Sequence, residues 1–420
     1  MSTDAIPLGP EDRAILGLES DTVAGHTCKV VVLGPGAPGL DALRARIADR
    51  LELTPALRRR LGGTARDPAW VPDEAFELSD HVVACRSDAP LEDARLPGLV
   101  AELFAERLDR ARPLWRIDVA PLAGGGAALV WRLHHAVADG TTAMRYARLL
   151  LWADPQASAP AAAAPSTGDH EADQARRRGH LAAFLHREFA RGRGASPFDG
   201  RIGTRRAIAF AATPLTELHD AAHALAGATI NDGVLAVLAG ALRRWVEDQH
   251  GSLGDVRAKV PVSLHHEGDD AGNRDSFFTL PLPLNEPDPV ARLHAVSAAT
   301  AARKAGHDAE ELDEIHRELA GVSPRMEAFC EQLERSPRRF ALSVSNVPGP
   351  RSAVSVLGAP VDQLYSIAEI GERHALRVAV VSCAGTLGFG FCADPAIVAG
   401  LDSLAAGAEA EAAALIAAQR

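Results

Sequence analysis

Residues 127–150 read AALVWRLHHAVADGTTAMRYARLL. The apolar run before the histidines predicts a strand, and the apolar spacing after Gly140 predicts a helix. His134 and His135 end the strand, where side chains can face a cleft, and Asp139 stands at the helix start, where it can cap N–H groups or bind an arginine. Gly140 permits a close backbone approach. A lone histidine pair would indicate only a capped turn, but the full HHxxxDG spacing favours a functional site.

Strand-like and helix-like segments alternate on both sides of this motif. Residues 154–178 are rich in Ala, Pro, Ser and charge without apolar periodicity, which predicts a linker. It separates an N-terminal half at 1–153, which carries HHxxxDG, from a C-terminal half at 179–420. The alternation predicts an α/β fold of two sandwich halves with mixed β-sheets. The predicted strands are 29–33, 82–85, 115–119, 127–133, 205–210, 256–262, 276–284, 341–345, 361–367, 376–382 and 387–392, and the helices are 40–51, 96–108, 141–152, 214–225, 232–248, 290–304 and 401–416.

The composition indicates a globular protein that does not bind nucleic acid generally. Of the 420 residues 47% are hydrophobic and 24% charged, which is enough apolar material for a large core. Lys plus Arg is 44 and Asp plus Glu is 55, so the net charge is −11, whereas nucleic-acid binding needs a basic surface. There is no signal-peptide pattern and no apolar run of about 18 residues. We therefore expect a soluble, cytoplasmic protein that can associate with a lipid surface peripherally.

Five cysteines are scattered along the chain without a CxxC pair. This spacing predicts neither a zinc ribbon nor a disulfide framework, and we expect reduced thiols. The cysteines are Cys28, Cys85, Cys330, Cys383 and Cys392.

A literal dinucleotide-binding pattern is formed by Gly34, Gly36 and Gly39. Pro35 and Pro38 interrupt it and remove N–H groups that a phosphate loop would donate. No acidic residue follows at the distance that a ribose would need. We therefore expect a strand–helix connection and no nicotinamide cofactor.

The sequence patterns of a metal site and of a serine nucleophile are both missing. The histidine pairs 134–135 and 265–266 are adjacent in sequence, so their side chains point in different directions, and no HExxH occurs. We therefore expect no metal. The nucleophile-elbow pattern GxSxG is also missing, so a serine nucleophile of the α/β-hydrolase type is not predicted.

Taken in order, several segments make the chain resemble the bacterial wax ester synthase/diacylglycerol acyltransferase family. HHxxxDG is the signature of the wider superfamily of chloramphenicol acetyltransferase and peptide-synthetase condensation domains. The ordered set is far more specific than HHxxxDG alone, and it runs from about residue 7 to the C-terminal helix. The segments are Pro7–Arg13 (PLGPEDR), Leu108–Trp115 (LDRARPLW), HHAVADG, Ala228–Val234 (ATINDGV), Gly272–Arg274 (GNR) and Ser345–Pro350 (SNVPGP).

The resemblance implies two chloramphenicol-acetyltransferase-like halves with a tunnel between them. It also implies acyl transfer from acyl-CoA, a co-substrate, to a long-chain alcohol or diacylglycerol, with no further cofactor. His135 would be the general base, while His134, Asp139 and Gly140 would build its turn. A neutral imidazole with a pKa of about 6.5 suits this task, so we expect the rate to fall below that pH. Members often carry His-Val-Gly on the first strand, where this chain has His26–Lys29 (HTCK).

Further positions are open to two interpretations. Asn231 and Asp232 resemble the family's ND motif at the substrate site, but such residues also cap helices. Ser345 and Asn346, which follow a strand with Ser343, could donate to an oxyanion or cap a turn. Trp115 could contact the acyl chain, although packing is the commoner role of a buried tryptophan.

Two other activities remain open at this point. One is acylation of a specialised metabolite, or transfer from a carrier protein instead of CoA. The other is a non-catalytic scaffold of the same fold that binds an acylated partner. The intact histidine pair favours catalysis, because a binding module need not keep a base.

Overall fold

The computed structural model describes residues 4–64, 67–85, 89–153, 196–251, 256–263, 275–305 and 339–420. The predicted linker, Cys330, the histidine pair 265–266 and the GNR segment lie outside the described residues.

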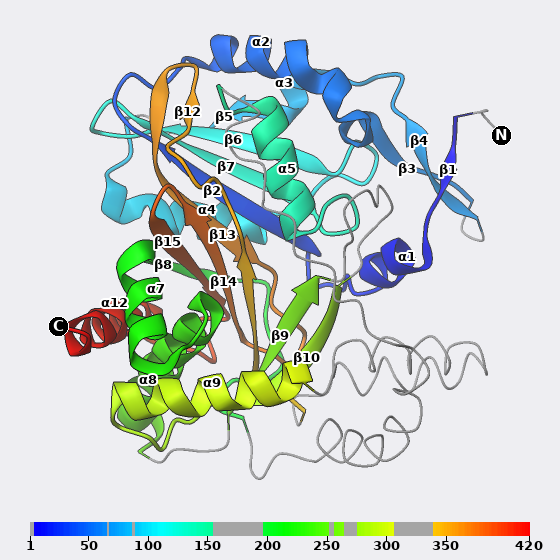
Figure 1. Cartoon of the computed structure of the whole chain (residues 1–420). Coiled ribbons are helices and arrows are strands. Elements are labelled where there is room, and N and C mark those ends of the chain that lie inside the picture. The colour runs from blue at the N-terminus through cyan, green and yellow to red at the C-terminus, as the bar shows by residue number, and fades with distance from the viewer. Residues whose placement is uncertain are drawn as a thin grey trace, which may run out of the picture.

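The histidine motif is carried by a six-stranded sheet (Figure 1). Its central strands are buried because α2 and α5 pack on one face and α4 on the other. β6 and β7 are antiparallel and form the predicted hairpin, with Leu122 N–H donating to Gly126 O at 2.9 Å. The strand order is β12 (Ser355–Val356), β13 (Ala359–Ala368), β2 (His26–Leu33), β7 (Ala127–His134), β6 (Trp115–Pro121) and β5 (Val82–Ala84), and the helices are α1 (Pro10–Leu16), α2 (Leu40–Arg50), α3 (Leu78–His81), α4 (Leu96–Ala105) and α5 (Gly140–Leu150).

A second six-stranded sheet forms the C-terminal half. β11 lies parallel to both its neighbours, β9 and β14, whereas the remaining pairs are antiparallel, so the sheet is mixed as predicted. Helices pack on one face, and α8 is buried along most of its length. The strand order is β10 (Asp275–Pro281), β9 (Arg257–Ser263), β11 (Leu342–Val347), β14 (Leu376–Cys383), β15 (Thr386–Ala393) and β8 (Ala207–Pro214), and the helices are α7 (Leu215–Ala226), α8 (Ile230–His250), α9 (Pro289–Ala305) and α12 (Leu401–Ala418).

The chain crosses between the halves through β12 and β13, which belong to the C-terminal part of the sequence but pair in the N-terminal sheet. β13 runs antiparallel to β2, with Val361 opposite Leu33 and Ala368 opposite Thr27. On its way β13 passes so close over β15 that side chains at Gly388 and Gly390 would collide with its backbone carbonyls. The glycines of β15 are therefore required by the contact between the two sheets.

A small third sheet was not predicted from the sequence. It has the order β1-β4-β3 and contains short strands rich in Pro, Gly and Arg, which lack the alternation of a half-buried strand. Its strands are β1 (Ile6–Pro7), β4 (Pro68–Pro72) and β3 (Arg59–Gly63).

The helices and cysteines agree with a chain that lacks a membrane span and a disulfide framework in its described part. Within the described ranges, no single helix has the length and apolarity to cross a membrane; α7 and α8 meet these criteria only as a pair bent by 93°. Cys28, Cys85, Cys383 and Cys392 are free thiols. Burial raises the pKa of the Cys28 thiol to about 12.

Candidate active site

The histidine motif forms the predicted strand, turn and helix. β7 ends at His134, and the carbonyl of His134 accepts hydrogen bonds from the N–H groups of Val137 (2.9 Å) and Ala138 (3.2 Å). Asp139 is the N-cap of α5, and its Oδ1 accepts a hydrogen bond from Thr142 N–H at 2.6 Å. The predicted capping role of Asp139 is therefore confirmed.

The side chain of His134 is buried, and both of its ring nitrogens face polar atoms. Nδ1 accepts a hydrogen bond from Ala136 N–H at 3.1 Å, and Nε2 lies 2.8 Å from Oε1 of Glu19. Across the sheet, His134 is paired with His26 on β2. The His26 ring lies 2.7 Å from the Phe104 carbonyl through Nε2, and burial lowers its pKa to about 3. His134 is thus a buried residue that contacts Ala136 and Glu19.

His135 follows in the turn, and its backbone N–H donates to Gly25 O at 2.9 Å. Burial, together with the positive charge of Arg377, lowers the pKa of its imidazole to about 4. Asp139 and a hydrogen bond to the residue's own backbone act in the opposite direction and raise the pKa. The His135 ring is therefore neutral at pH 7, although its pKa lies well below the 6.5 that we expected from the sequence.

The end of β11 lies against the histidine turn. A Cβ on Gly140 would be 2.7 Å from Cγ2 of Val347, the last residue of β11. Ser345 and Asn346 immediately precede Val347 and are half-buried, opposite residues of β14 in the sheet. The fold thus brings the predicted SNVPGP segment and the HHxxxDG motif, which are far apart in sequence, to one place between the halves.

The ND pair occupies the first turn of α8. Thr229 is the N-cap, and the Asp232 carboxylate accepts hydrogen bonds from its N–H and hydroxyl, both at 2.8 Å. The hydroxyl of Thr300 on α9 donates to the other oxygen of Asp232 at 2.5 Å. Asp232 therefore caps α8 and joins it to α9, while Asn231 is half-buried beside it.

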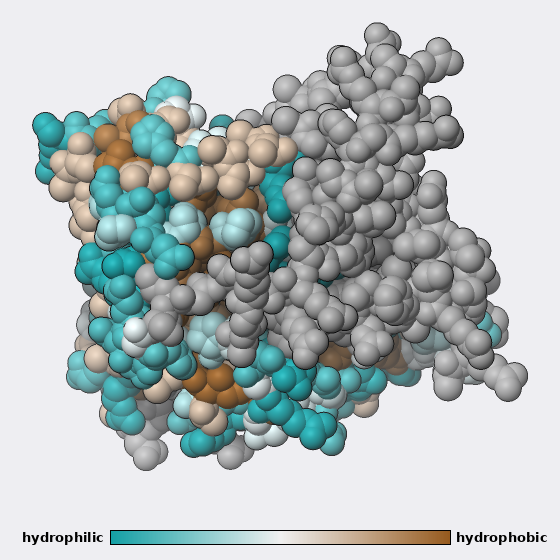
Figure 2. Space-filling model, turned by 90° about the horizontal axis from the view of Figure 1, so that it is seen from below, coloured by the Kyte–Doolittle hydropathy of each residue, from teal (hydrophilic) through white to brown (hydrophobic). Residues whose placement is uncertain are grey.

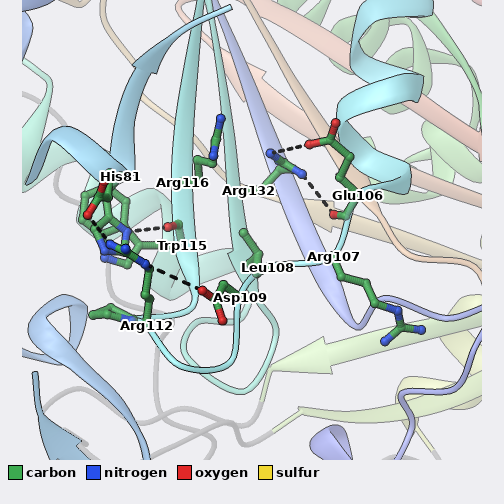
Figure 3. Close-up of a pocket in the computed structure, with 11 residues that line it drawn as sticks. His81, Glu106, Arg107, Leu108, Asp109, Arg112, Trp115, Arg116 and Arg132 are labelled. Atoms are coloured by element: carbon green, nitrogen blue, oxygen red, sulfur yellow. Dashed lines mark hydrogen bonds and ion pairs between the residues drawn. The ribbon is translucent and has the colours of Figure 1, made fainter. Parts of the chain in front are cut away.

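Trp115 packs at the start of β6. Its indole Nε1–H donates to Leu57 O at 2.7 Å, and its ring stacks on His81 with the centroids 4.6 Å apart. These contacts are those of a packing residue. Trp115 also borders a cavity of about 300 Å³. In this cavity Nη1 of Arg132 donates a hydrogen bond to the carbonyl of Glu106, the residue after α4, at 3.0 Å (Figure 3).

β2, the strand on which family members often carry His-Val-Gly, contains a buried lysine in this chain. Lys29 is fully buried, and its ammonium donates to Ser366 Oγ at 2.7 Å. Burial lowers its pKa to about 8, whereas the nearby Asp139 carboxylate raises it. A buried lysine thus lies near the aspartate of HHxxxDG.

Sequence reasoning missed Glu19, Gly25 and Arg377. Glu19 is a single acid in a loop, and Arg377 is one residue of a long strand, so neither has a spacing signal. Gly25 has a φ of +74°, and this could have been suspected only from glycine's preference for that conformation.

The glycine pattern at 34–39 is the connection from β2 to α2, as predicted. Gly34 N–H donates to Pro360 O at 3.0 Å and Gly36 N–H to Gly125 O at 3.2 Å. β2 is antiparallel to both its neighbours, unlike the parallel strands of a dinucleotide-binding unit. Over the described part of the chain, no three His, Cys, Asp or Glu side chains gather as metal ligands would.

Comparison with known proteins covers nearly the whole chain. The family model for the wax ester synthase/diacylglycerol acyltransferase catalytic domain matches residues 8–190, and the model for the C-terminal domain of that family matches residues 271–415. A probable diacylglycerol O-acyltransferase, tgs1, of Mycobacterium tuberculosis (strain ATCC 25618 / H37Rv) is 30% identical over 92% of this chain and 90% of its own length.

Two solved structures have the same fold. A wax ester synthase/diacylglycerol acyltransferase from Marinobacter aquaeolei VT8 aligns over 99% of both chains with a TM-score of 0.71 and 22% identity. The starter condensation domain of rhizomide synthetase, solved with C8-CoA and Leu-SNAC, aligns over 99% of this chain and 94% of its own with a TM-score of 0.57 and 15% identity. The predicted pair of chloramphenicol-acetyltransferase-like halves is confirmed. The chain belongs to the wax ester synthase/diacylglycerol acyltransferase family and is an acyltransferase.

Proposed function

We propose that the chain transfers an acyl group from acyl-CoA to the hydroxyl of a long-chain alcohol or diacylglycerol, with His135 as the general base. The family supports the reaction and the acceptor class. The CoA donor is supported by the condensation domain of the same fold that was solved with C8-CoA.

One observation separates the two histidines. Nδ1 of His134 accepts a hydrogen bond from Ala136 N–H, and Nε2 lies 2.8 Å from the Glu19 carboxylate. The ring of His135 is neutral at pH 7, and it bonds to the residue's own backbone. A neutral imidazole carries one N–H and one basic nitrogen, and we propose that Nε2 is the basic atom that faces the substrate.

The reaction follows from this arrangement. Nε2 of His135 accepts the hydroxyl proton as the alcohol oxygen bonds to the thioester carbonyl carbon. The tetrahedral oxyanion next to the ring favours the imidazolium form. The C–S bond then breaks, and the imidazolium returns the proton to the departing CoA thiolate. The thioester is already activated, so no covalent acyl-enzyme is needed.

Donors to the oxyanion are proposed at the end of β11. Ser345 and Asn346 are half-buried polar residues directly before Val347, which touches the position of Gly140. A hydroxyl or amide N–H in this place would stabilise the oxyanion. Asp232 and Asn231 would act less directly, because Asp232 fixes α8 against α9.

Thiol release from acyl-CoA tests the proposal with fatty alcohols, diacylglycerol and amines as acceptors, and with an acyl carrier protein as a second donor. His135→Ala should lower kcat on the order of 10²–10⁴-fold with the fold intact. His219→Ala, at an exposed site on α7, is the matched control and should leave kcat unchanged. Near-full transfer by His135→Ala when chemistry limits the rate would disprove the base. Failure of the wild type with every acceptor would favour the binding scaffold.

Peripheral association of the protein with a lipid surface stays a prediction. On the face in Figure 2, hydrophobic residues emerge in separate areas bordered by hydrophilic ones. In the described ranges the large exposed hydrophobic residues are Ile6, Leu18 and Leu53. Sedimentation with lipid vesicles tests the association, and a protein that stays in the supernatant at all lipid concentrations would contradict it.

A further inference from the structure

Glu19 lies in the loop after α1, and its carboxylate receives three donors from two other parts of the chain. Oε1 is 2.8 Å from Nε2 of His134 and 2.7 Å from Nη2 of Arg110, and Oε2 is 3.2 Å from Nη1 of Arg107. The side chain is 12% exposed. Hydrogen bonds from His134 and Arg110 keep the pKa of this carboxyl below its usual value although burial raises it, so Glu19 is an anion.

The contact with Glu19 fixes the tautomer of His134. A neutral imidazole has one N–H donor and one acceptor nitrogen. Nδ1 is the acceptor, because it faces the N–H of Ala136 at 3.1 Å. A neutral His134 ring then carries its proton on Nε2, which lies 2.8 Å from Oε1 of the Glu19 carboxylate. A carboxylate is a stronger acceptor than a neutral oxygen.

The same loop also touches the backbone of the turn. His135 N–H donates to Gly25 O at 2.9 Å, and Arg107 holds the loop through Val23 O at 2.9 Å. A Cβ on Gly25 would lie 2.7 Å from Nε2 of His134 and 2.9 Å from Cγ of Glu19. The loop and the histidine turn are thus packed as one unit, in which the carboxylate of Glu19 meets the ring of His134.

We propose that Glu19 is a positioning residue for acyl transfer: its carboxylate holds His134 as the Nε2–H tautomer and so fixes the turn that presents His135. This rests on the proposed function, because the turn matters for catalysis only if His135 is the base. Glu19 does not touch the substrate in this proposal; it acts through His134. Its removal should therefore lower kcat more than it changes KM for acyl-CoA.

The test combines kinetics with the ring signals of His134. Glu19→Ala should lower kcat on the order of 10²-fold, as for a misplaced catalytic group, and leave KM within roughly twofold. Glu19→Gln keeps an acceptor oxygen but loses the charge and should lie between Glu19→Ala and the wild type. Glu102→Gln, an exposed acid on α4, is the control and should behave as wild type.

Imidazole ¹⁵N chemical shifts report the tautomer directly. The chain has 16 histidines, so the His134 signals are identified as those missing from His134→Gln. We expect the Nε2–H form in the wild type and a mixture of forms in Glu19→Ala. Wild-type kcat in a folded Glu19→Ala protein, or unchanged His134 shifts in it, would overturn the proposal. If Glu19→Ala does not fold, the kcat and the His134 shifts of Glu19→Gln decide instead. Activity in His135→Ala would refute the role of His135 as the general base, and this variant should leave the His134 shifts unchanged.

Discussion

Gly140 at the start of α5 lies against Val347 at the end of β11, in the other half: a methyl group on Gly140 would lie 2.7 Å from Cγ2 of Val347. Real Cβ atoms do not approach other atoms so closely, so with a side chain at residue 140 the Val347 side chain, β11 or the turn must shift. The glycine of HHxxxDG is therefore required by the partner strand of the other half, and Ser345 and Asn346 lie on that strand.

Gly140→Ala should lower kcat about tenfold and destabilise the protein by about 1–3 kcal/mol, because overpacking moves neighbouring backbone. Val347→Ala removes the colliding methyl group, so the double variant should recover much of both losses. Thiol-release rates and denaturant unfolding measure the two effects. A double variant no better than Gly140→Ala would show that the contact is not the cause.

The pH dependence should follow His135. Its pKa is about 4, so kcat/KM should stay level from pH 8 to about 5 and fall only as the pH drops through about 4, where the ring gains a proton. Arg377→Met removes a positive charge that lowers this pKa, so the fall should move to higher pH. Arg373→Met, at an exposed residue, should not move it. A fall centred near 6.5 in the wild type would contradict the burial effect.

Asp139 can be tested as a cap and as a charge separately. Asp139→Ala should cost about 1 kcal/mol of unfolding free energy, because Thr142 N–H loses its acceptor. Asp139→Asn keeps a good cap and should unfold nearly as the wild type. Both variants lose the carboxylate that raises the pKa of His135, so both should lose activity. Equal stability of the two variants in urea would argue against the capping role.

Acid should destabilise the protein through histidines that are buried in neutral form. The pKa of His26 is about 3 in the folded protein and about 6.5 in an unfolded chain, so the unfolded state binds a proton first as the pH falls. Its contribution is fully present above pH 6.5 and is lost progressively down to pH 3. Between pH 7.5 and 5.5 this amounts to about 1 kcal/mol.

His26→Gln should reduce the difference between the unfolding free energies at pH 7.5 and 5.5 by about that amount, and Gln can still donate to the Phe104 carbonyl. The exposed His219→Gln should leave the difference unchanged. The same pH slope in His26→Gln and the wild type would contradict this assignment.

Most elements of the fold could be predicted because their periodicity is local. The helix expected at 40–51 is α2 at Leu40–Arg50, and the strand expected at 376–382 is β14 at Leu376–Cys383. β1, β3, β4 and β12 were missed because short strands with proline or glycine carry too little alternation. The pairing of β13 with β2 was also missed, since it depends on residues far apart in sequence.

The residues of the candidate site likewise divide into those that a local motif contains and those that come from distant segments. His135, Asp139 and Gly140 could be found because one local motif contains them. Glu19 and Arg377 could not, because each reaches the turn from a distant element, and a single charged residue has no pattern of its own. The depressed pKa of His135 also depends on three-dimensional burial and was not predictable from an isolated imidazole.

The position of β13 has a consequence for dividing the protein. A fragment that ends before the C-terminal half would leave β2 as an unpaired edge of apolar residues, which invites aggregation. Co-expression with the complementary fragment would supply β13 and cover that edge. Segments of this chain therefore cannot be exchanged with those of a relative at the linker alone, because β2 and the strand that completes its sheet must be taken from the same parent or be redesigned together.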